Sequence, residues 1–150
     1  MEKDQVLNQT DVEREEFLPE EEYRKLPTLL GAPPLTLAQK VAGILDSKRG
    51  REIKVLHVED KTVIADYFVL CTGNSSTHVK SLVEEVEYRC GLRGVQPRHV
   101  EGRGNSAWVI ADYSSVIVHV FSREAREFYD LDKLYGDATE VSLEGITQGE

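Results

Sequence analysis

The stretch Cys71–Ser76, C-T-G-N-S-S, is the segment of this chain most typical of an enzyme. It follows an apolar run with strand character and precedes a helical pattern, and backbone N–H groups at a helix start attract anions such as phosphate. Enzymes that transfer nucleotides present phosphate on such a turn, but they also need paired carboxylates on a neighbouring strand to hold Mg²⁺. The D-x-D of this chain, Asp130–Asp132, lies in a C-terminal helical pattern instead. The favoured interpretation is structural: Gly73 forms a tight turn at the end of the strand, and one of the next three residues caps the helix. Phosphate binding remains the alternative.

His119 is a second candidate, as a general base, because it stands in an apolar run with Asp112 on the same predicted strand face. Catalysis would also require a nucleophile or a metal within hydrogen-bond reach of the ring. Ser115 is the nearest nucleophile by register, but two residue pairs along a strand is too far for contact. The pattern therefore favours a buried structural histidine packed against Trp108.

Cysteine and histidine spacing indicates no metal centre. Cys71 and Cys90 lack the close pairing of zinc ligands, and the remaining histidines are dispersed along the chain. We expect no metal, no cofactor and free thiols of the kind kept in a reducing cytoplasm. The acidic N-terminus lacks the apolar core of a secretory signal, and the apolar runs are too short to span a membrane. We therefore expect a cytoplasmic protein without membrane contact.

The 150-residue chain carries a net charge of −9, and this charge lies at its ends. Residues 1–33 hold nine acids and four bases, residues 137–150 hold four acids and no base, and residues 34–136 are neutral. A neutral body without a basic stripe argues against direct, sequence-specific nucleic acid binding. We expect an acidic, flexible N-terminal extension (1–33) with a short helix near P-E-E-E-Y-R-K-L, one domain (34–136) and an acidic C-terminal tail (137–150).

Apolar periodicity predicts the order helix, two strands, helix, three strands and helix. This order indicates the α/β fold class with mixed α+β character, in which a mixed sheet is flanked by helices. The first helix is expected to begin with a Thr36 cap and end at Gly50. The clearest helix, over residues 74–91, carries an apolar stripe formed by Val79, Leu82, Val83, Val86 and Cys90. The apolar residues Phe128, Leu131, Leu134 and Tyr135 predict a last helix or pair of turns.

The stretch A-W-V-I-A-D-Y-S-S-V-I-V-H-V-F, residues 107–121, predicts a hairpin whose two faces differ. The expected register pairs Ala111 with Val116, Ile110 with Ile117, Val109 with Val118 and Trp108 with His119. One face is then small and apolar, a floor for helices, whereas the other is large and mixed. That second face brings together aromatic residues without a catalytic constellation, which is typical of a protein-binding surface. The alternative, a face covered by the last helix, is equally compatible with the pattern.

The order and spacing of several blocks resemble the ribosomal silencing factor (Iojap-like) family. These blocks are A-D-Y-F-V-L-C-T-G-N-S-S-T-H-V-K-S-L, a following E-G, and A-W-V-I-A-D-Y-S-S-V-I-V-H-V-F-S-R-E-A-R-E-F-Y-D-L-D-K-L-Y-G-D-A. The resemblance runs from Leu35 to Ala138. It implies a mixed five-stranded sheet with flanking helices, distantly similar to nucleotidyltransferases but without their catalytic acids. The family commonly has Gly-Asp where this chain has Ser114-Ser115, so the turn type is not carried over.

The resemblance also implies a function without catalysis. Family members bind protein uL-fourteen on the large (50S) ribosomal subunit, block joining of the small subunit and repress translation, with a further role in large-subunit assembly. Some members form homodimers. Carried over residue by residue, the partner surface would be Trp108, Glu101, Gly102, Asp112, Tyr113, His119 and Tyr129. An enzyme or nucleotide-binding protein that uses the G-N-S-S turn, and a homodimerising scaffold, remain as alternatives.

Overall fold

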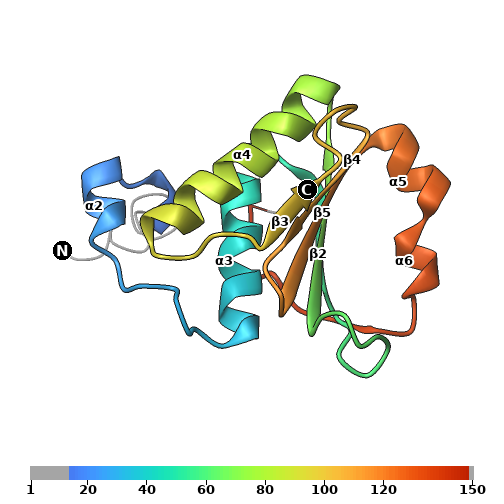
Figure 1. Cartoon of the computed structure of the whole chain (residues 1–150), viewed down its shortest axis with the longest axis horizontal. Helices are drawn as coiled ribbons and strands as arrows, with labels where there is room; N and C mark the ends of the chain where they lie inside the picture. Colours follow the sequence, from blue (N-terminus) through green and yellow to red (C-terminus); the bar gives the residue numbers. More distant parts are fainter. Residues whose placement is uncertain (1–13, 149–150) are drawn as a thin grey trace.

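The structure is a computed structural model in which residues 14–148 are described. It is a sheet with helices on both faces, and Figure 1 shows it edge-on, with α3 and α4 on one side and α5 and α6 on the other. The elements in chain order are η1 (Glu15–Phe17), α2 (Glu20–Arg24), α3 (Pro34–Ser47), β1 (Arg51–His57), β2 (Tyr67–Gly73), α4 (Ser76–Leu92), β3 (His99–Glu101), β4 (Trp108–Asp112), β5 (Val116–Ser122), α5 (Arg123–Tyr129), α6 (Leu131–Leu134) and β6 (Thr139–Glu140).

The sheet is mixed and has six strands in the order β3-β4-β5-β2-β1-β6. The central pair, β2 and β5, is parallel, and the other neighbours are antiparallel. The mixed sheet flanked by helices confirms the fold class expected from the sequence. The sixth strand is the two-residue β6, which the sequence did not predict and which pairs with the end of β1.

The helices α3 and α4 cover the face made of small aliphatic side chains, as predicted. The apolar stripe of α4 from Val79 to Cys90 is buried, and Ser75 caps this helix by accepting a hydrogen bond from the His78 backbone N–H at 3.1 Å. The expected Thr36 cap on α3 is wrong, because the helix begins at Pro34 and has no side-chain cap. Proline suits the first helical position, where a backbone N–H has no partner within the helix.

The β4–β5 hairpin has a register two residues away from the expected one. Trp108 lies opposite Phe121 and Ile110 lies opposite His119, whereas the sequence analysis paired Trp108 with His119. Because side chains alternate with a period of two, this shift keeps every residue on its predicted face. The two-faced character of the hairpin is therefore confirmed although its register was wrong.

The turn of the hairpin explains the register. Tyr113 donates its backbone N–H to Val116 O at 2.8 Å, so that the loop contains only Ser114 and Ser115. Ser114 has a positive φ of 74°, a conformation that costs energy for most residues. The Asp112 carboxylate stabilises it by accepting the Ser114 backbone N–H at 2.7 Å.

The C-terminal helical segment is broken into α5 and α6 rather than continuous. Asp130 lies between them in the left-handed conformation (φ 51°, ψ 51°) and caps α6 through the Lys133 backbone N–H. Of the four apolar residues of this segment, Leu131 is buried and Tyr135 packs against the cluster around Phe68, whereas Phe128 and Leu134 are exposed.

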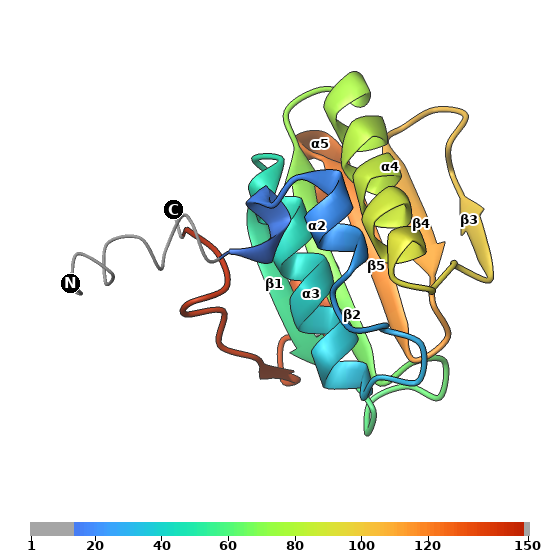
Figure 2. The same ribbon diagram turned by 90° about the vertical axis from the view of Figure 1, so that its left-hand side faces the viewer.

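Residues 14–30, which we call the N-terminal strap, pack across α3 and α4 (Figure 2). Tyr23 of α2 is fully buried, and its ring lies 4.8 Å from the Arg89 guanidinium and 5.3 Å from that of Arg93. The Leu29 backbone N–H donates to Arg93 O at 2.8 Å. The short helix near Tyr23 was predicted, whereas the contacts of residues 14–30 with α3 and α4 were not. Residues 1–13 lie outside the described part.

Charged contacts fix the strap where its composition suggested solvent exposure. The Glu15 carboxylate contacts Lys40 Nζ at 2.9 Å and Arg93 Nη1 at 2.8 Å. Arg14 Nη1 contacts Asp46 Oδ2 at 2.8 Å, and the same oxygen accepts the Gln148 backbone N–H at 3.0 Å. Both ends of the described chain are therefore attached to α3.

The C-terminal residues also belong to the fold. Beyond β6, Val141, Leu143 and Ile146 are partly buried against the core of the α3 side. No helix among residues 14–148 is long and apolar enough to cross a lipid bilayer.

Candidate protein-binding surface

Trp108 is at the centre of an aromatic cluster on the α5–α6 side of the sheet. Its ring centroid lies 5.1 Å from that of Phe121 and 4.5 Å from that of Tyr129. The indole Nε1–H donates to His119 Nδ1 at 3.2 Å. The side chain is half-buried, so that one part of the ring is fixed by neighbours while another part reaches solvent.

His119 holds the indole from the inside of the cluster. Because Nδ1 accepts the Trp108 hydrogen bond, the proton of the neutral ring is assigned to Nε2. Burial lowers the pKa of His119 to about 4, so the ring is neutral at physiological pH and keeps its acceptor. Phe68 meets the imidazole in a T-shaped contact with 4.7 Å between the ring centroids. The His119 ring therefore supports Trp108 and, because it is buried, is not accessible as a general base.

The exposed part of the cluster lies on α5 and α6. We call Trp108, Phe128, Tyr129 and Leu134 the Trp108 surface. Phe128 is 80% exposed and Leu134 is 68% exposed, and the Phe128 ring stands perpendicular to Tyr129 with 5.0 Å between the centroids. Exposed large apolar side chains grouped on rigid elements are typical of protein-binding sites.

A buried arginine fixes the two short helices that carry this surface. Arg126 of α5 binds both carboxylate oxygens of Asp132 of α6, at 2.7 and 3.0 Å, and donates to Thr72 Oγ1 at 2.9 Å. Lys54 Nζ adds a contact with Asp132 at 3.0 Å. The hydrogen bonds from Arg126, followed by those from Lys54, lower the pKa of Asp132 to about 2. The carboxylate is therefore ionised throughout the neutral range and attaches α6 to the sheet.

Glu101 and Asp112 lie on the same sheet face as Trp108, toward the β3 edge. Glu101 pairs with Ile110 across the strands, and its carboxylate contacts His99 Nε2 at 3.0 Å. Asp112 contacts Arg98 Nη2 at 3.2 Å in addition to stabilising the hairpin turn. Both acids therefore have partners within the chain, and Glu101 is the more exposed of the two.

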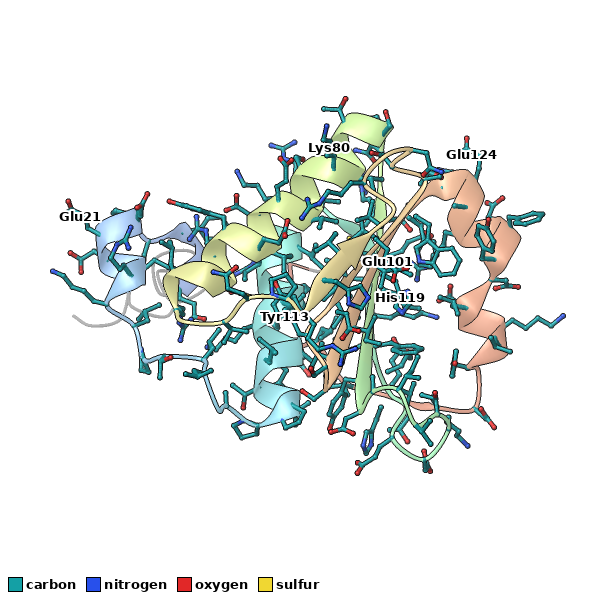
Figure 3. All side chains as sticks on the ribbon, in the orientation of Figure 1. Glu21, Lys80, Glu101, Tyr113, His119 and Glu124 are labelled. Carbon is teal, nitrogen blue, oxygen red and sulfur yellow. The ribbon has the colours of Figure 1, made fainter. Side chains whose placement is uncertain are left out.

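Gly102 supports the Trp108 backbone rather than offering a side chain. It has a φ of 92°, and a Cβ atom at this position would come within 2.2 Å of Trp108 O. Only glycine allows this close approach of the β3–β4 connection. Tyr113, by contrast, lies on the opposite face of the sheet, buried in the α3–α4 core, as Figure 3 also shows relative to His119.

The G-N-S-S turn is occupied by hydrogen bonds of the chain itself. Besides the Ser75 cap, the Asn74 backbone N–H donates to His78 Nδ1 at 2.8 Å, and His78 Nε2 lies 2.9 Å from Lys48 O. A Cβ atom on Gly73 would lie 2.8 Å from the Val79 side chain, so glycine permits close packing of β2 on α4. This geometry is the capping arrangement that the sequence favoured. Among the described residues, no group of three or more His, Cys, Asp or Glu is arranged to hold a metal ion.

The structure thus brings together three of the predicted site residues, Trp108, His119 and Tyr129, with Glu101 and Asp112 on the same face. It does not bring Tyr113 to this surface. Phe128 and Leu134 were not named as surface residues, because they were counted only as apolar residues of the last helical segment. The D-L-D-K sequence carried a signal for the break, since an aspartate three residues before a helical N–H is a common cap.

Comparison with known proteins places residues 32–150 within a family model described as "Ribosomal silencing factor during starvation". The chain is 37% identical over 108 residues to Ribosomal silencing factor RsfS of Bacillus subtilis, covering 71% of this chain and 92% of the relative. It is 28% identical over 98 residues to "Mitochondrial assembly of ribosomal large subunit protein 1" of Mus musculus, covering 63% and 43% of the two chains. A crystal structure from Chromobacterium violaceum superimposes with a TM-score of 0.67 at 27% identity, covering 69% of this chain and 87% of that one.

Proposed function

The chain belongs to the ribosomal silencing factor family, and we propose on this premise that it binds protein uL-fourteen on the large ribosomal subunit. Bound there, it sterically prevents the small subunit from joining and so represses translation. We further propose that the chain acts in the cytoplasm. Steric occupancy requires neither turnover nor a cofactor, and we propose no catalytic role.

The observation that supports this proposal is the exposed, rigidly held Trp108 surface. An interface anchor needs a large apolar area that does not have to be ordered on binding. Trp108 meets this need because His119, Phe121 and Tyr129 already fix its ring. Phe128, which is largely exposed beside Tyr129, adds further apolar area.

Glu101 would contribute specificity at the rim of this surface. It is exposed beside the Trp108 backbone, and its acidic side chain suits a basic ribosomal protein. Asp112 and Gly102 would act indirectly, by holding the hairpin turn and the β3–β4 connection. Tyr113 would act only through the core beneath β4.

Two further roles follow from the same surface. The printed name of the mouse relative concerns assembly of the large subunit, and we extend this role to the present chain through binding of an immature subunit. In the absence of ribosomes, an exposed apolar surface of this kind also suits self-association. We propose that two copies pair through it, so that homodimer and ribosome complex exclude each other.

The test is cosedimentation of the purified chain with 50S subunits in a sucrose gradient, followed by addition of 30S subunits. We expect the chain to move with 50S and to decrease the amount of 70S formed. A chain that stays at the top of the gradient, or that binds 50S without affecting 70S formation, would contradict the proposal.

A further inference from the structure

The β1–β2 loop, residues 58–66, ends in an apolar tip that the Trp108 surface does not include. Val63 is fully exposed and Ile64 is 59% exposed, whereas Val58 and Ala65 at the base of the loop are buried. The buried residues belong to the apolar cluster under α6, which also contains Phe68. The tip therefore projects outward from the same side of the sheet.

Hydrogen bonds order this tip. The backbone N–H groups of Lys61 and Thr62 donate to Val58 O at 2.8 and 3.0 Å. The Ile64 backbone N–H donates to Thr62 Oγ1 at 3.3 Å, and Val58 N–H donates to Asp66 O at 2.8 Å. The two apolar side chains are thus held in solvent by a formed turn, which decreases the entropy lost when a partner covers them.

The tip lies next to the end of α6. Lys61 Nζ contacts Asp137 Oδ2 at 3.3 Å, and Tyr135, just beyond α6, meets Phe68 with 5.0 Å between the ring centroids. Figure 1 shows the loop below β2, on the side of the sheet that carries α6. Exposed apolar side chains are thus present both on α5 and α6, at Phe128 and Leu134, and on the loop that contacts the chain just beyond α6, at Val63.

The charges around the tip indicate what kind of partner surface would bind it. Glu59 and Asp137 have side chains that are 65% and 77% exposed, and Asp60 is exposed beside them. Acidic groups around an apolar centre suit a protein surface with an apolar depression and basic groups at its rim. They repel the phosphates of RNA and of anionic lipid headgroups.

We propose that Val63 and Ile64 form a second anchor for the large-subunit protein that the Trp108 surface binds. This inference rests on the proposed function and extends the partner surface along the α5–α6 side to the β1–β2 loop. The partner would present an apolar depression with basic side chains around it, separate from the pocket that takes Trp108.

The test compares Val63→Asp and Ile64→Asp with wild type in a binding titration against 50S subunits. As a matched control, Leu30→Asp places the same charge at a residue that is 71% exposed on the strap. We expect affinity to fall about tenfold for each tip variant and to remain at the wild-type value for the control. Thermal unfolding of all three variants should match wild type, because the replaced side chains are exposed.

Tip variants that bind like wild type, while wild type binds 50S, would overturn this inference and leave the proposed function intact. Wild type that fails to bind 50S would overturn both. A photoreactive phenylalanine derivative at position 63 identifies what covers the tip. The same derivative at position 128 identifies the ribosomal protein bound by the Trp108 surface. Crosslinks from position 63 to that protein would support the inference, and crosslinks to ribosomal RNA would contradict it.

Discussion

The α3–α4 face and the α5–α6 face of the sheet both bury aliphatic strands, but they meet the solvent differently. On the α3–α4 face, the chain covers its own helices with the N-terminal strap, and Tyr23 is the buried anchor. On the α5–α6 face, two short helices leave Phe128 and Leu134 exposed beside a half-buried Trp108. The first face is closed by the chain itself, and the second is available for a partner.

Aromatic side chains on the two faces show what this difference means. Tyr23 and Trp108 are both held by cationic or polar neighbours and by close packing. Tyr23 is completely covered, so its contacts stabilise the fold. Trp108 is fixed but incompletely covered, so that part of its apolar area is available for binding. Changes on the closed face should affect stability, and changes on the open face should affect partner binding.

The largest effect on the closed face is expected from Tyr23→Ala. Removal of a fully buried aromatic ring should lower the free energy of unfolding by about 4 kcal/mol, measured by urea denaturation. Tyr23→Phe keeps the ring between Arg89 and Arg93 and should remain close to wild type. Affinity for 50S under native conditions should not change in either variant. A loss of affinity in Tyr23→Phe would mean that the two faces are not independent.

On the open face, Trp108→Ala should weaken binding to 50S subunits by about 3 kcal/mol, within the usual range for an interface anchor. The matched control is Tyr88→Ala, which removes an exposed aromatic ring from α4 on the other face. Titration of each variant against 50S measures the difference. Equal affinities for the two variants would remove the distinction between the faces.

Burial of His119 on the open face should make the free energy of unfolding depend on pH. Its pKa is about 4 in the folded chain, against an ordinary value of 6.5, because burial disfavours the charged ring. The unfolded chain therefore binds a proton in this window while the folded chain does not, and the free energy of unfolding falls as pH decreases from about 6.5 to about 4. The total loss should reach about 3 kcal/mol. Denaturation at several pH values checks this slope, and in His119→Gln this contribution should vanish.

The smallest effect is expected from Asp132→Asn, which weakens the attachment of α6. The pKa of about 2, lowered mainly by the Arg126 hydrogen bonds, means that the carboxylate stabilises the fold above about pH 4 and that this contribution is lost as pH falls toward 2. The variant should lose about 1 to 2 kcal/mol of stability at neutral pH, since solvent partly screens the group. Its 50S affinity should fall less than that of Trp108→Ala. A variant as stable as wild type would show that the hydrogen bond from Arg126 to Thr72 is enough to hold Arg126 in place.

Much of the fold could be predicted from the sequence where local and tertiary signals agree. The apolar stripe of α4, the apolar β2 and the two different faces of the hairpin follow from periodicity of 3.6 or 2 residues, and the helix cap follows from the residue types of the N-S-S turn. The hairpin register was wrong because it depends on which two residues form the turn: the expected pairing centres the turn on Tyr113 and Ser114, whereas the structure centres it on Ser114 and Ser115. The even shift kept the faces, so Trp108 and His119 were still placed together.

The remaining errors come from contacts between distant residues. The sequence did not indicate that the acidic strap contacts the body, as Glu15 does with Lys40 and Arg93. No local pattern reports such pairs. The exposure of Phe128 and Leu134 depends on how α5 and α6 pack on the sheet, which Arg126 fixes through Thr72 and Asp132. Of the Trp108 surface, the sequence analysis named Trp108 and Tyr129 but not Phe128 or Leu134.

Hydrogen exchange of the chain, free and bound to 50S subunits, tests the difference between the faces most directly. Binding should slow exchange of backbone amides in β4, α5 and α6, and leave the amides of α2 and α4 unchanged. Slower exchange confined to α2 and α4 would place the partner on the face that the strap closes, and would contradict the assignment of the Trp108 surface as the binding site.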